Sequence, residues 1–454
     1  MKKVLLFLVL SMLIGHNPAS GLKSSDEPHL IIISIDGFPA DALDNEDIPL
    51  PNIRKLAEDG VRAEAMIPSN PTNTWPNHTT MVTGLSAAHH NLLHNGLLRY
   101  DQDQKAFYVD NDTDRGQLID VPTLYDAAHQ EGLQTAEINW PATRGAESLD
   151  FSMPDVLYSV EHTTSSLCEA LIEAGVLRDE DKDHPFLQRT PPGRDEVWNQ
   201  AAIHLIEEHQ PNLLLHHLLN VDTVHHLHGV DTSAGYTALT LADRHVGELL
   251  NALDQAGIRE QSTVFIVSDH GFINVDYTLY PNVLLKEHGL LETNDDGEIK
   301  NARAQVVATG GTAMVVTTED SDEDDLTEAA KILEDAEGIA GVIDPDEYEA
   351  YGLPQPDESD QIGQLFLKAE PGYGFQNSAD EEEYIGEDGR LIGYHGYPND
   401  YSEMQTIFIA SGKGIKSGVT IDTIENLFVA PTAAELLEIS LDEAESEAVE
   451  EILD

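Results

Sequence analysis

The stretch HLIIISIDG, residues 29–37, is an apolar run that ends abruptly in Asp36 and Gly37. A strand buried on both faces reads as such a continuous run, whereas a half-buried strand alternates between apolar and polar residues. Four later runs have the same character: TAEIN (135–139), NLLLHHLLNVD (212–222), STVFIVSD (262–269) and MQTIFIASG (404–412). We expect all five to be buried parallel strands.

Helical patterns separate these runs, at residues 120–132, 196–209 and 236–257. Alternating strands and helices predict an α/β domain, in which helices cover both faces of a mostly parallel sheet. Residues 281–390 are more mixed, with a strand pattern in GGTAMVVTT (310–318) and a helical pattern in DLTEAAKILEDAEG (325–338). This segment predicts a smaller α+β insertion.

The N-terminus, MKKVLLFLVLSMLIGHNPASG (1–21), has two lysines, an apolar run and then small residues. This pattern is typical of a secretory signal peptide, cleaved near Ser20 or Gly21; an uncleaved anchor is the alternative. We therefore expect a secreted or periplasmic protein, with a catalytic domain over 22–454 and no other membrane span. The single cysteine, Cys168, excludes stabilisation by an intrachain disulfide.

The chain is very acidic, with 83 Asp and Glu against 24 Lys and Arg and a net charge of −59. Such a charge repels nucleic acid, so we expect no nucleic-acid-binding module. Acidic runs recur at 317–330, at 377–390 and in 441–454, where we expect a last helix. Disorder is one interpretation; the apolar segments between the runs favour a folded, halophilic protein with a hydrated surface.

The stretch SNPTNTWPNHTTMVTG (69–84) holds Thr74 between Pro71 and Pro76. The prolines exclude a helix interior, so we expect a turn and then a helix starting near His78. A rigid turn is one interpretation. The other is a nucleophilic hydroxyl at a helix N-terminus, where backbone N–H groups point outward.

Acidic residues and histidines follow three of the predicted strands. Ligands of a doubly wound sheet bind at these carboxyl ends of the strands. Each alone is explained as a helix cap or turn, and we interpret His216 and His217, inside a strand, as structural. Together the residues at the strand ends indicate a metal site, and mixed His and carboxylate ligands suit zinc. The candidates are Asp36, Asp222, His225, His226, His228, Asp269 and His270, with His395 in GYHGYPND (393–400).

The chain resembles the nucleotide pyrophosphatase/phosphodiesterase branch of the alkaline-phosphatase superfamily over roughly residues 28–410. The motifs that carry the resemblance are IIISIDG (31–37), TNTWPNHTTMVTG (72–84), HHNLLHNG (89–96), NVDTVHHLHG (220–229), VSDHGF (267–272) and GYHGYPND (393–400). The resemblance implies an alkaline-phosphatase-like three-layer α/β/α sandwich. It also implies a two-zinc phosphodiesterase or nucleotide pyrophosphatase that acts on small phosphate esters through a phospho-threonine intermediate on Thr74.

The resemblance assigns two zinc sites. One zinc is held by Asp222, His226 and His395, and the second by Asp36, Asp269, His270 and the Thr74 hydroxyl. His225 and His228 fall outside the family's Asp-x-x-x-His spacing and are expected to be neighbours. Asn95 matches an asparagine that donates to a phosphate oxygen, or it forms an Asn-Gly turn.

Trp75 matches an aromatic residue of the family's substrate pocket, although core packing explains it equally well. Arg144 departs from the family, because diesterases carry a small or acidic residue there. Related monoesterases clamp the additional phosphate oxygen with a Lys and an Arg; here Ala142 stands where a lysine would complete the clamp. A surface ion pair is the alternative role of Arg144.

We expect a diesterase. A phosphomonoesterase or phosphonate hydrolase on the same metals is the alternative, and a non-catalytic, acidic metal-binding protein is a distant one.

Overall fold

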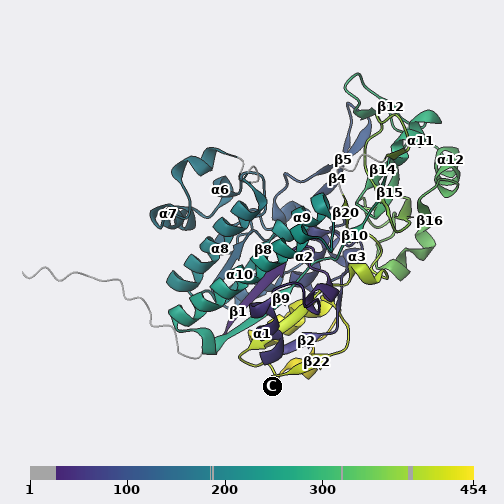
Figure 1. The fold of residues 1–454 in the computed structure, drawn as a ribbon. Coiled ribbons are helices and arrows are strands. Elements are labelled where there is room, and N and C mark those ends of the chain that lie inside the picture. Colours follow the sequence, from purple (N-terminus) through teal and green to yellow (C-terminus); the bar gives the residue numbers. More distant parts are fainter. Residues whose placement is uncertain (1–26, 185, 187–188, 319–320, 387–391) are drawn as a thin grey trace, which may run out of the picture.

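A computed structural model describes residues 27–454 except 185, 187–188, 319–320 and 387–391 (Figure 1). Its centre is an eight-stranded sheet with the strand order β22-β2-β21-β9-β1-β8-β6-β7. In that order the strands are Val419–Ile421, Val61–Ala63, Phe408–Gly412, Ser262–Val267, His29–Ile35, Leu213–Leu218, Thr135–Ile138 and Phe151–Met153. The predicted signal peptide lies outside the described residues.

The core of this sheet is parallel: β1 pairs in parallel with β8 and with β9. The prediction that all five apolar runs are parallel was wrong for β21, which runs antiparallel to β9, with Phe408 opposite Val267 and Gly412 opposite Thr263. The chain leaves the sheet after β9, builds a second lobe and re-enters beside the same end. An apolar run reports burial on both faces but not the direction of the strand.

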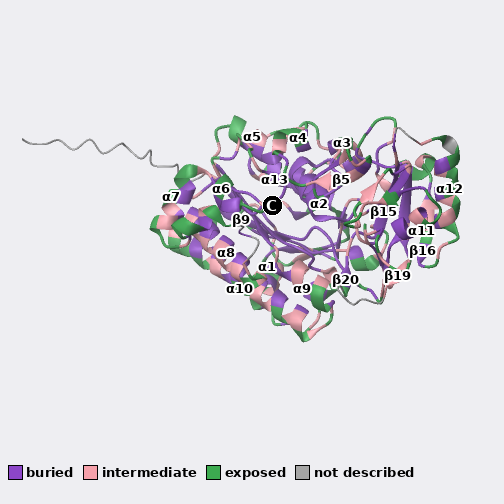
Figure 2. Cartoon of the chain, turned by 90° about the horizontal axis from the view of Figure 1, so that it is seen from above, coloured by how far each residue is buried: buried purple, intermediate pink, exposed green. Residues whose placement is uncertain are grey.

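Helices cover both faces of the sheet, which gives three layers (Figures 1 and 2). Ile31, Ile33 and Ile35 of β1 pack with α1 (Pro51–Asp59), α7 (Ser165–Glu173), α8 (Pro191–Glu208) and α10 (Ser233–Ala256). Leu30 and Ile32 face the other way, toward α2 (Thr74–Thr83), α5 (Leu124–Gln130) and α13 (Val429–Leu436). The alternation along one fully buried strand divides the hydrophobic core into two halves.

The second lobe lies between β9 and β21 in the sequence. It contains a four-stranded antiparallel sheet in the order β14-β15-β17-β16, whose strands are Ala304–Ala308, Thr312–Thr317, Leu365–Ala369 and Ile339–Ile343. Helices α11 (Pro281–Glu287) and α12 (Glu323–Glu334) pack beside it, and the lobe has its own hydrophobic cluster. A hairpin of β4 (Leu97–Asp101) and β5 (Ala106–Asp110) approaches this lobe.

The expected last helix over 441–454 was wrong: this segment has only a short 3₁₀ turn, Glu450–Ile452. Glutamates and aspartates three and four residues apart destabilise an α-helix by mutual repulsion. Val449 and Ile452 instead anchor the irregular segment in the core beside α13.

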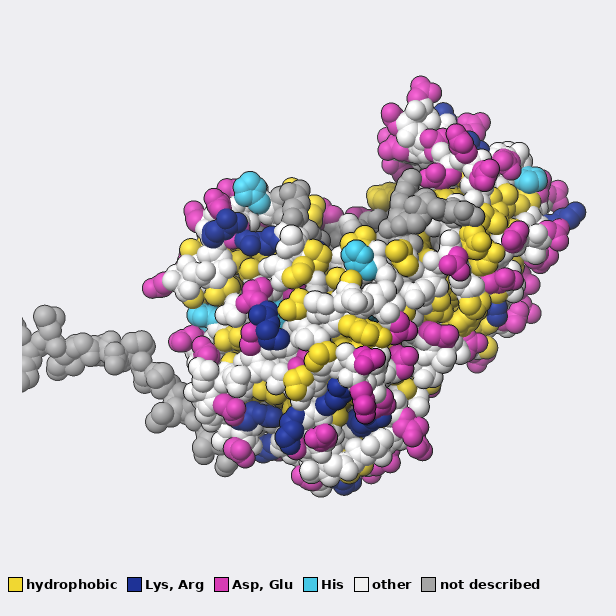
Figure 3. Space-filling view, viewed as in Figure 1, with side chains coloured by type: hydrophobic (Ala, Val, Ile, Leu, Met, Phe, Trp, Pro, Cys, Tyr) yellow, Lys and Arg dark blue, Asp and Glu magenta, His cyan; other side chains and the backbone are white. Residues whose placement is uncertain are grey.

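On the face in view, Asp and Glu side chains are spread widely and crowd the tip of the second lobe around β12 (Glu292–Thr293) (Figure 3). Among the described residues, no helix is both long enough and apolar enough to cross a membrane.

Candidate active site

Thr74 is the first residue of α2. The helix therefore begins four residues before the predicted start at His78. The prediction treated Pro76 as a helix breaker, but the first N–H groups of a helix have no intrahelical acceptor, so proline is tolerated in the first turn. Asn73 precedes the helix in an extended conformation. The Thr74 side chain thus lies at a helix N-terminus, and the residue is only 7% exposed.

The metal-ligand candidates come from four separate segments at one edge of the sheet. Asp36 follows β1, and Asp269 and His270 follow β9. Asp222 and His226 lie one turn apart in α9 (Asn220–His228), directly after β8, and His395 follows β20 (Gly393–Tyr394) in the second lobe. The fold therefore brings together residues up to 359 positions apart in the sequence.

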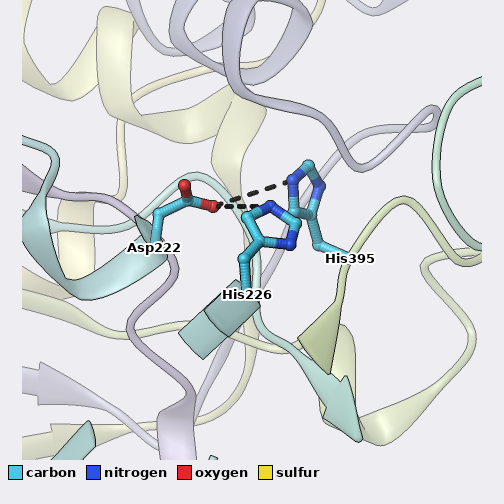
Figure 4. Close-up of side chains that lie close together, drawn as sticks. All are labelled: Asp222, His226 and His395. Atoms are coloured by element: carbon cyan, nitrogen blue, oxygen red, sulfur yellow. Dashed lines mark ion pairs between the residues drawn. The ribbon is translucent and has the colours of Figure 1, made fainter. Parts of the chain in front are cut away.

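The first group is Asp222, His226 and His395, whose side chains point toward one another (Figure 4). The Asp222 Oδ1 atom lies 3.3 Å from His226 Nε2 and 3.7 Å from His395 Nε2. One carboxylate oxygen thus faces two imidazole nitrogens. The distances between these atoms are those expected of ligands around a shared cation.

The second group is deeper and includes the hydroxyl of Thr74. His270 Nε2 lies 3.3 Å from Asp36 Oδ1, 3.3 Å from Asp269 Oδ2 and 3.4 Å from Thr74 Oγ1. The His270 ring stacks on His395 of the first group, with 3.7 Å between the ring centroids. The two groups are therefore adjacent and share one wall.

The hydrogen bonds around the three histidines suit metal ligation. In each of them Nδ1 faces a backbone carbonyl: Gly393 for His226, Gly271 for His270 and Thr72 for His395. A proton on Nδ1 satisfies that carbonyl and leaves the Nε2 lone pair directed into the site, which is the usual arrangement of zinc-bound imidazoles.

The carboxylates of the two groups also suit metal ligation. Both side-chain oxygens of Asp36, Asp222 Oδ1 and Asp269 Oδ2 are buried and have no hydrogen-bond partner among the described residues. Uncompensated buried carboxylates are costly unless a cation pairs with them. Their orientation and chemistry fit divalent metal ions.

The pKa values point the same way. Burial, together with the charges of Asp269 and Asp222, raises the pKa of Asp36 well above its usual value. Burial lowers the pKa of His270 to about 4, so its imidazole is neutral and able to ligate at neutral pH.

A cavity of about 530 Å³ opens above these groups. It brings the predicted substrate residues Trp75, Asn95 and Arg144 to the same space as Thr74 and the Asp222 group. Asn95 Oδ1 accepts a hydrogen bond of 2.9 Å from the Trp75 backbone N–H. That bond fixes the amide and leaves its NH₂ group to donate elsewhere.

Trp75 is both a packed residue and a wall of the cavity. It packs with Leu92, Leu97 and Leu118, and it also lines the cavity. Arg144 lines the cavity too, but its guanidinium is ion-paired: Nε lies 2.5 Å from Asp114 Oδ1, and Nη1 contacts Asp112. Arg144 is thus within the cavity, as a substrate-binding residue would be, and its guanidinium is also engaged in an ion pair.

Two residues near the site were missed by the sequence analysis. His217 of β8 was set aside as a structural strand histidine, yet its Nε2 lies 3.3 Å from Asp36 Oδ2 and neither ring nitrogen has a hydrogen-bond partner among the described residues. Asp155 lines the cavity; the acidic residue directly after a short strand and Pro154 was the available signal. His225 and His228 behave as expected: His225 turns to the Gly37 carbonyl and His228 is exposed.

Comparison with known proteins identifies similar sequences over most of the chain. The family profile described as type I phosphodiesterase / nucleotide pyrophosphatase matches residues 30–398. Ectonucleotide pyrophosphatase/phosphodiesterase family member 1 of Mus musculus is 25% identical over 418 residues, which are 91% of this chain and 41% of the mouse protein. The bis(5'-adenosyl)-triphosphatase enpp4 of Xenopus laevis is 24% identical, over 94% of this chain and 80% of that protein. The chain thus spans less than half the length of the mouse relative.

Solved structures show the same fold. Human ectonucleotide pyrophosphatase/phosphodiesterase 5 superposes with a TM-score of 0.69 at 18% identity, covering 94% of this chain and 100% of the human one. An inactive threonine-to-alanine variant of the murine protein, in complex with AMP, superposes with a TM-score of 0.71 at 17% identity and the same coverage. These likenesses confirm the predicted alkaline-phosphatase-like α/β/α architecture.

Proposed function

Because the chain belongs to the type I phosphodiesterase / nucleotide pyrophosphatase family, we propose that it is a two-zinc hydrolase of phosphate diester or pyrophosphate bonds with Thr74 as nucleophile. The observation that carries the proposal is the convergence of the Thr74 hydroxyl with two groups of carboxylate and imidazole side chains. The names of the relatives, and the inactive threonine variant of the murine protein with AMP, support it.

The ligand sets follow the two groups. Asp222, His226 and His395 would hold one zinc; Asp36, Asp269 and His270, with the Thr74 oxygen, would hold the other. Zinc bound there would lower the pKa of the hydroxyl and stabilise negative charge on the attacking and leaving oxygens.

The residues of the chain supply the rest of the reaction. Thr74 loses its hydroxyl proton to solvent, and Oγ1 forms a bond to phosphorus while the bond from phosphorus to the leaving oxygen breaks; the leaving oxygen departs with the electron pair and takes a proton from solvent. The Asn95 amide donates to a non-bridging phosphate oxygen, on which charge increases in the transition state. Water then hydrolyses the phospho-threonine and restores the Thr74 hydroxyl.

We also propose that residues 1–21 direct export and that the acidic surface suits high salt. N-terminal sequencing of protein from the culture medium tests the proposed export: it should begin near Ser20 or Gly21, and an intact Met1 on exported protein would contradict cleavage.

The experiment that tests the function compares kcat/KM for bis(p-nitrophenyl) phosphate and p-nitrophenyl phosphate, with zinc present. We expect a clear preference for the diester. Arg144 in the cavity is the observation that favours the second candidate, a phosphomonoesterase or phosphonate hydrolase, and a large preference for the monoester would establish that candidate instead. Turnover of neither compound would favour a non-catalytic metal-binding protein.

A further inference from the structure

Asp155 is a carboxylate in the cavity wall that the proposed reaction does not use. It follows β7, and its Oδ2 accepts a hydrogen bond of 3.4 Å from the indole Nε1 of Trp75. Asp155 is partly exposed to the cavity, and no protein donor to its Oδ1 is found among the described residues. The side chain is near enough to the second ligand group for its charge to contribute to raising the pKa of Asp36.

The surroundings leave this carboxylate poorly compensated. Arg144, the guanidinium in the same wall, is paired with Asp112 and Asp114. Arg194 acts on Asp155 only through its charge, and its own Nη2 lies 3.4 Å from Thr223 Oγ1. Burial raises the pKa of Asp155 to about 6, so the group is mostly ionised at pH 7 and still lacks a donor for Oδ1.

The same wall has flat and apolar surface. Trp75 is next to Thr74, and Leu157 and Tyr158 line the cavity with 49% and 40% of their surface exposed. Such side chains bind planar rings by stacking and apolar contact. Because Asp155 accepts a hydrogen bond at the edge of the Trp75 indole, a ring stacked on the indole would present its own edge to the carboxylate.

Building on the proposed function, we propose that Asp155 is a specificity-determining residue that selects nucleotide substrates whose base has an exocyclic amino group. The amino group of cytosine or adenine donates to Oδ1. Uracil and thymine have a carbonyl oxygen at the corresponding position, which repels a carboxylate. A polar group that the wrong substrate covers and leaves unpaired is a strong source of discrimination.

Cytidine and uridine 5'-(p-nitrophenyl phosphate) are the matched probes, because their rings have the same size. The wild type should favour the cytidine ester by about tenfold in kcat/KM. Asp155→Asn should bring this ratio to within about twofold or reverse it, since its amide can donate to the uracil carbonyl. Asp44→Asn, which removes an acidic side chain exposed on the surface, should leave the ratio unchanged.

Trp75→Phe separates base selection from positioning of the indole. It removes the indole N–H that donates a hydrogen bond to Asp155. Both esters should therefore be hydrolysed more slowly, while the ratio of their kcat/KM values is kept. An equal loss for both esters in Asp155→Asn, or no preference in the wild type, would overturn the inference. Bis(p-nitrophenyl) phosphate has no base and reports the proposed function independently: its hydrolysis without turnover of either nucleotide ester would also overturn the inference.

Discussion

The position of Thr74 combines three local features. It begins α2, its oxygen lies 3.4 Å from His270 Nε2, and it opens into the cavity. The sequence motif indicated the residue but misplaced the start of the helix, because a proline in a first turn looks like a helix breaker. His217 was missed for a related reason: a histidine in an apolar strand has no sequence signal that distinguishes it from a core residue.

Removing the hydroxyl should abolish covalent chemistry with little effect on the fold. We expect Thr74→Ala to lower kcat by at least about a hundredfold, while its zinc content stays near the wild-type level. Thr79→Ala is the matched control in the same helix, since the Thr79 hydroxyl is buried and has no hydrogen-bond partner among the described residues. Steady-state kinetics and metal analysis of both variants check this; near wild-type kcat in Thr74→Ala would indicate direct attack by water.

Arg144 is a cavity residue whose charge bears on the choice between monoesters and diesters in the proposed function. A free guanidinium would favour a monoester dianion by about 1.5–3 kcal/mol, but Asp112 and Asp114 already occupy this one. Arg144→Ala should therefore change diester kcat/KM little and lower whatever monoester activity exists. If the wild type strongly prefers monoesters and the variant loses that preference, the diesterase assignment is wrong.

Four segments build the ligand groups; strand patterns predicted three of them, and the resemblance to the family supplied His395. The apolar runs that end in Asp36, Asp222 and Asp269 become β1, β8 and β9, whose carboxyl ends meet at one edge of the sheet. The contribution of His395 depends on the second lobe folding back over that edge, which no local pattern specifies. The direction of β21 was unpredictable for the same reason.

Removing the metals should lower the stability of the protein where the strand ends and the second lobe meet. Without a cation, Asp36, Asp222 and Asp269 face one another in a buried site. We expect about two zinc ions per chain, as the two ligand groups predict, and a lower melting temperature as well as lost hydrolysis after treatment with EDTA. Metal analysis and thermal unfolding with and without added zinc check this; full activity in EDTA and no transition metal in the protein would refute it.

The whole molecule has a net charge of −59 spread over a folded surface. Figure 3 shows acidic side chains over the face in view; a halophilic surface stays a prediction from the composition. Composition did not predict the structure of 441–454, where the expected helix is absent and repulsion between neighbouring acidic side chains opposes one.

Self-repulsion at this charge should make stability depend on salt. The Debye length falls from about 10 Å at 0.1 M to about 3 Å at 1 M, which screens most surface repulsion. The melting temperature should therefore rise between dilute buffer and molar NaCl. A melting temperature that is flat or falls over this range would exclude the halophilic interpretation.

The central claim is that Thr74 becomes covalently linked to the phosphorus of the substrate. Rapid acid quenching during turnover of a nucleotide 5'-(p-nitrophenyl) ester, followed by peptide mass spectrometry, tests this most directly. We predict that the peptide containing Thr74 gains the mass of the nucleotidyl group, and that the adduct is absent in Thr74→Ala. Sustained turnover with Thr74 unmodified at every quench time, and with comparable kcat in Thr74→Ala, would contradict the account.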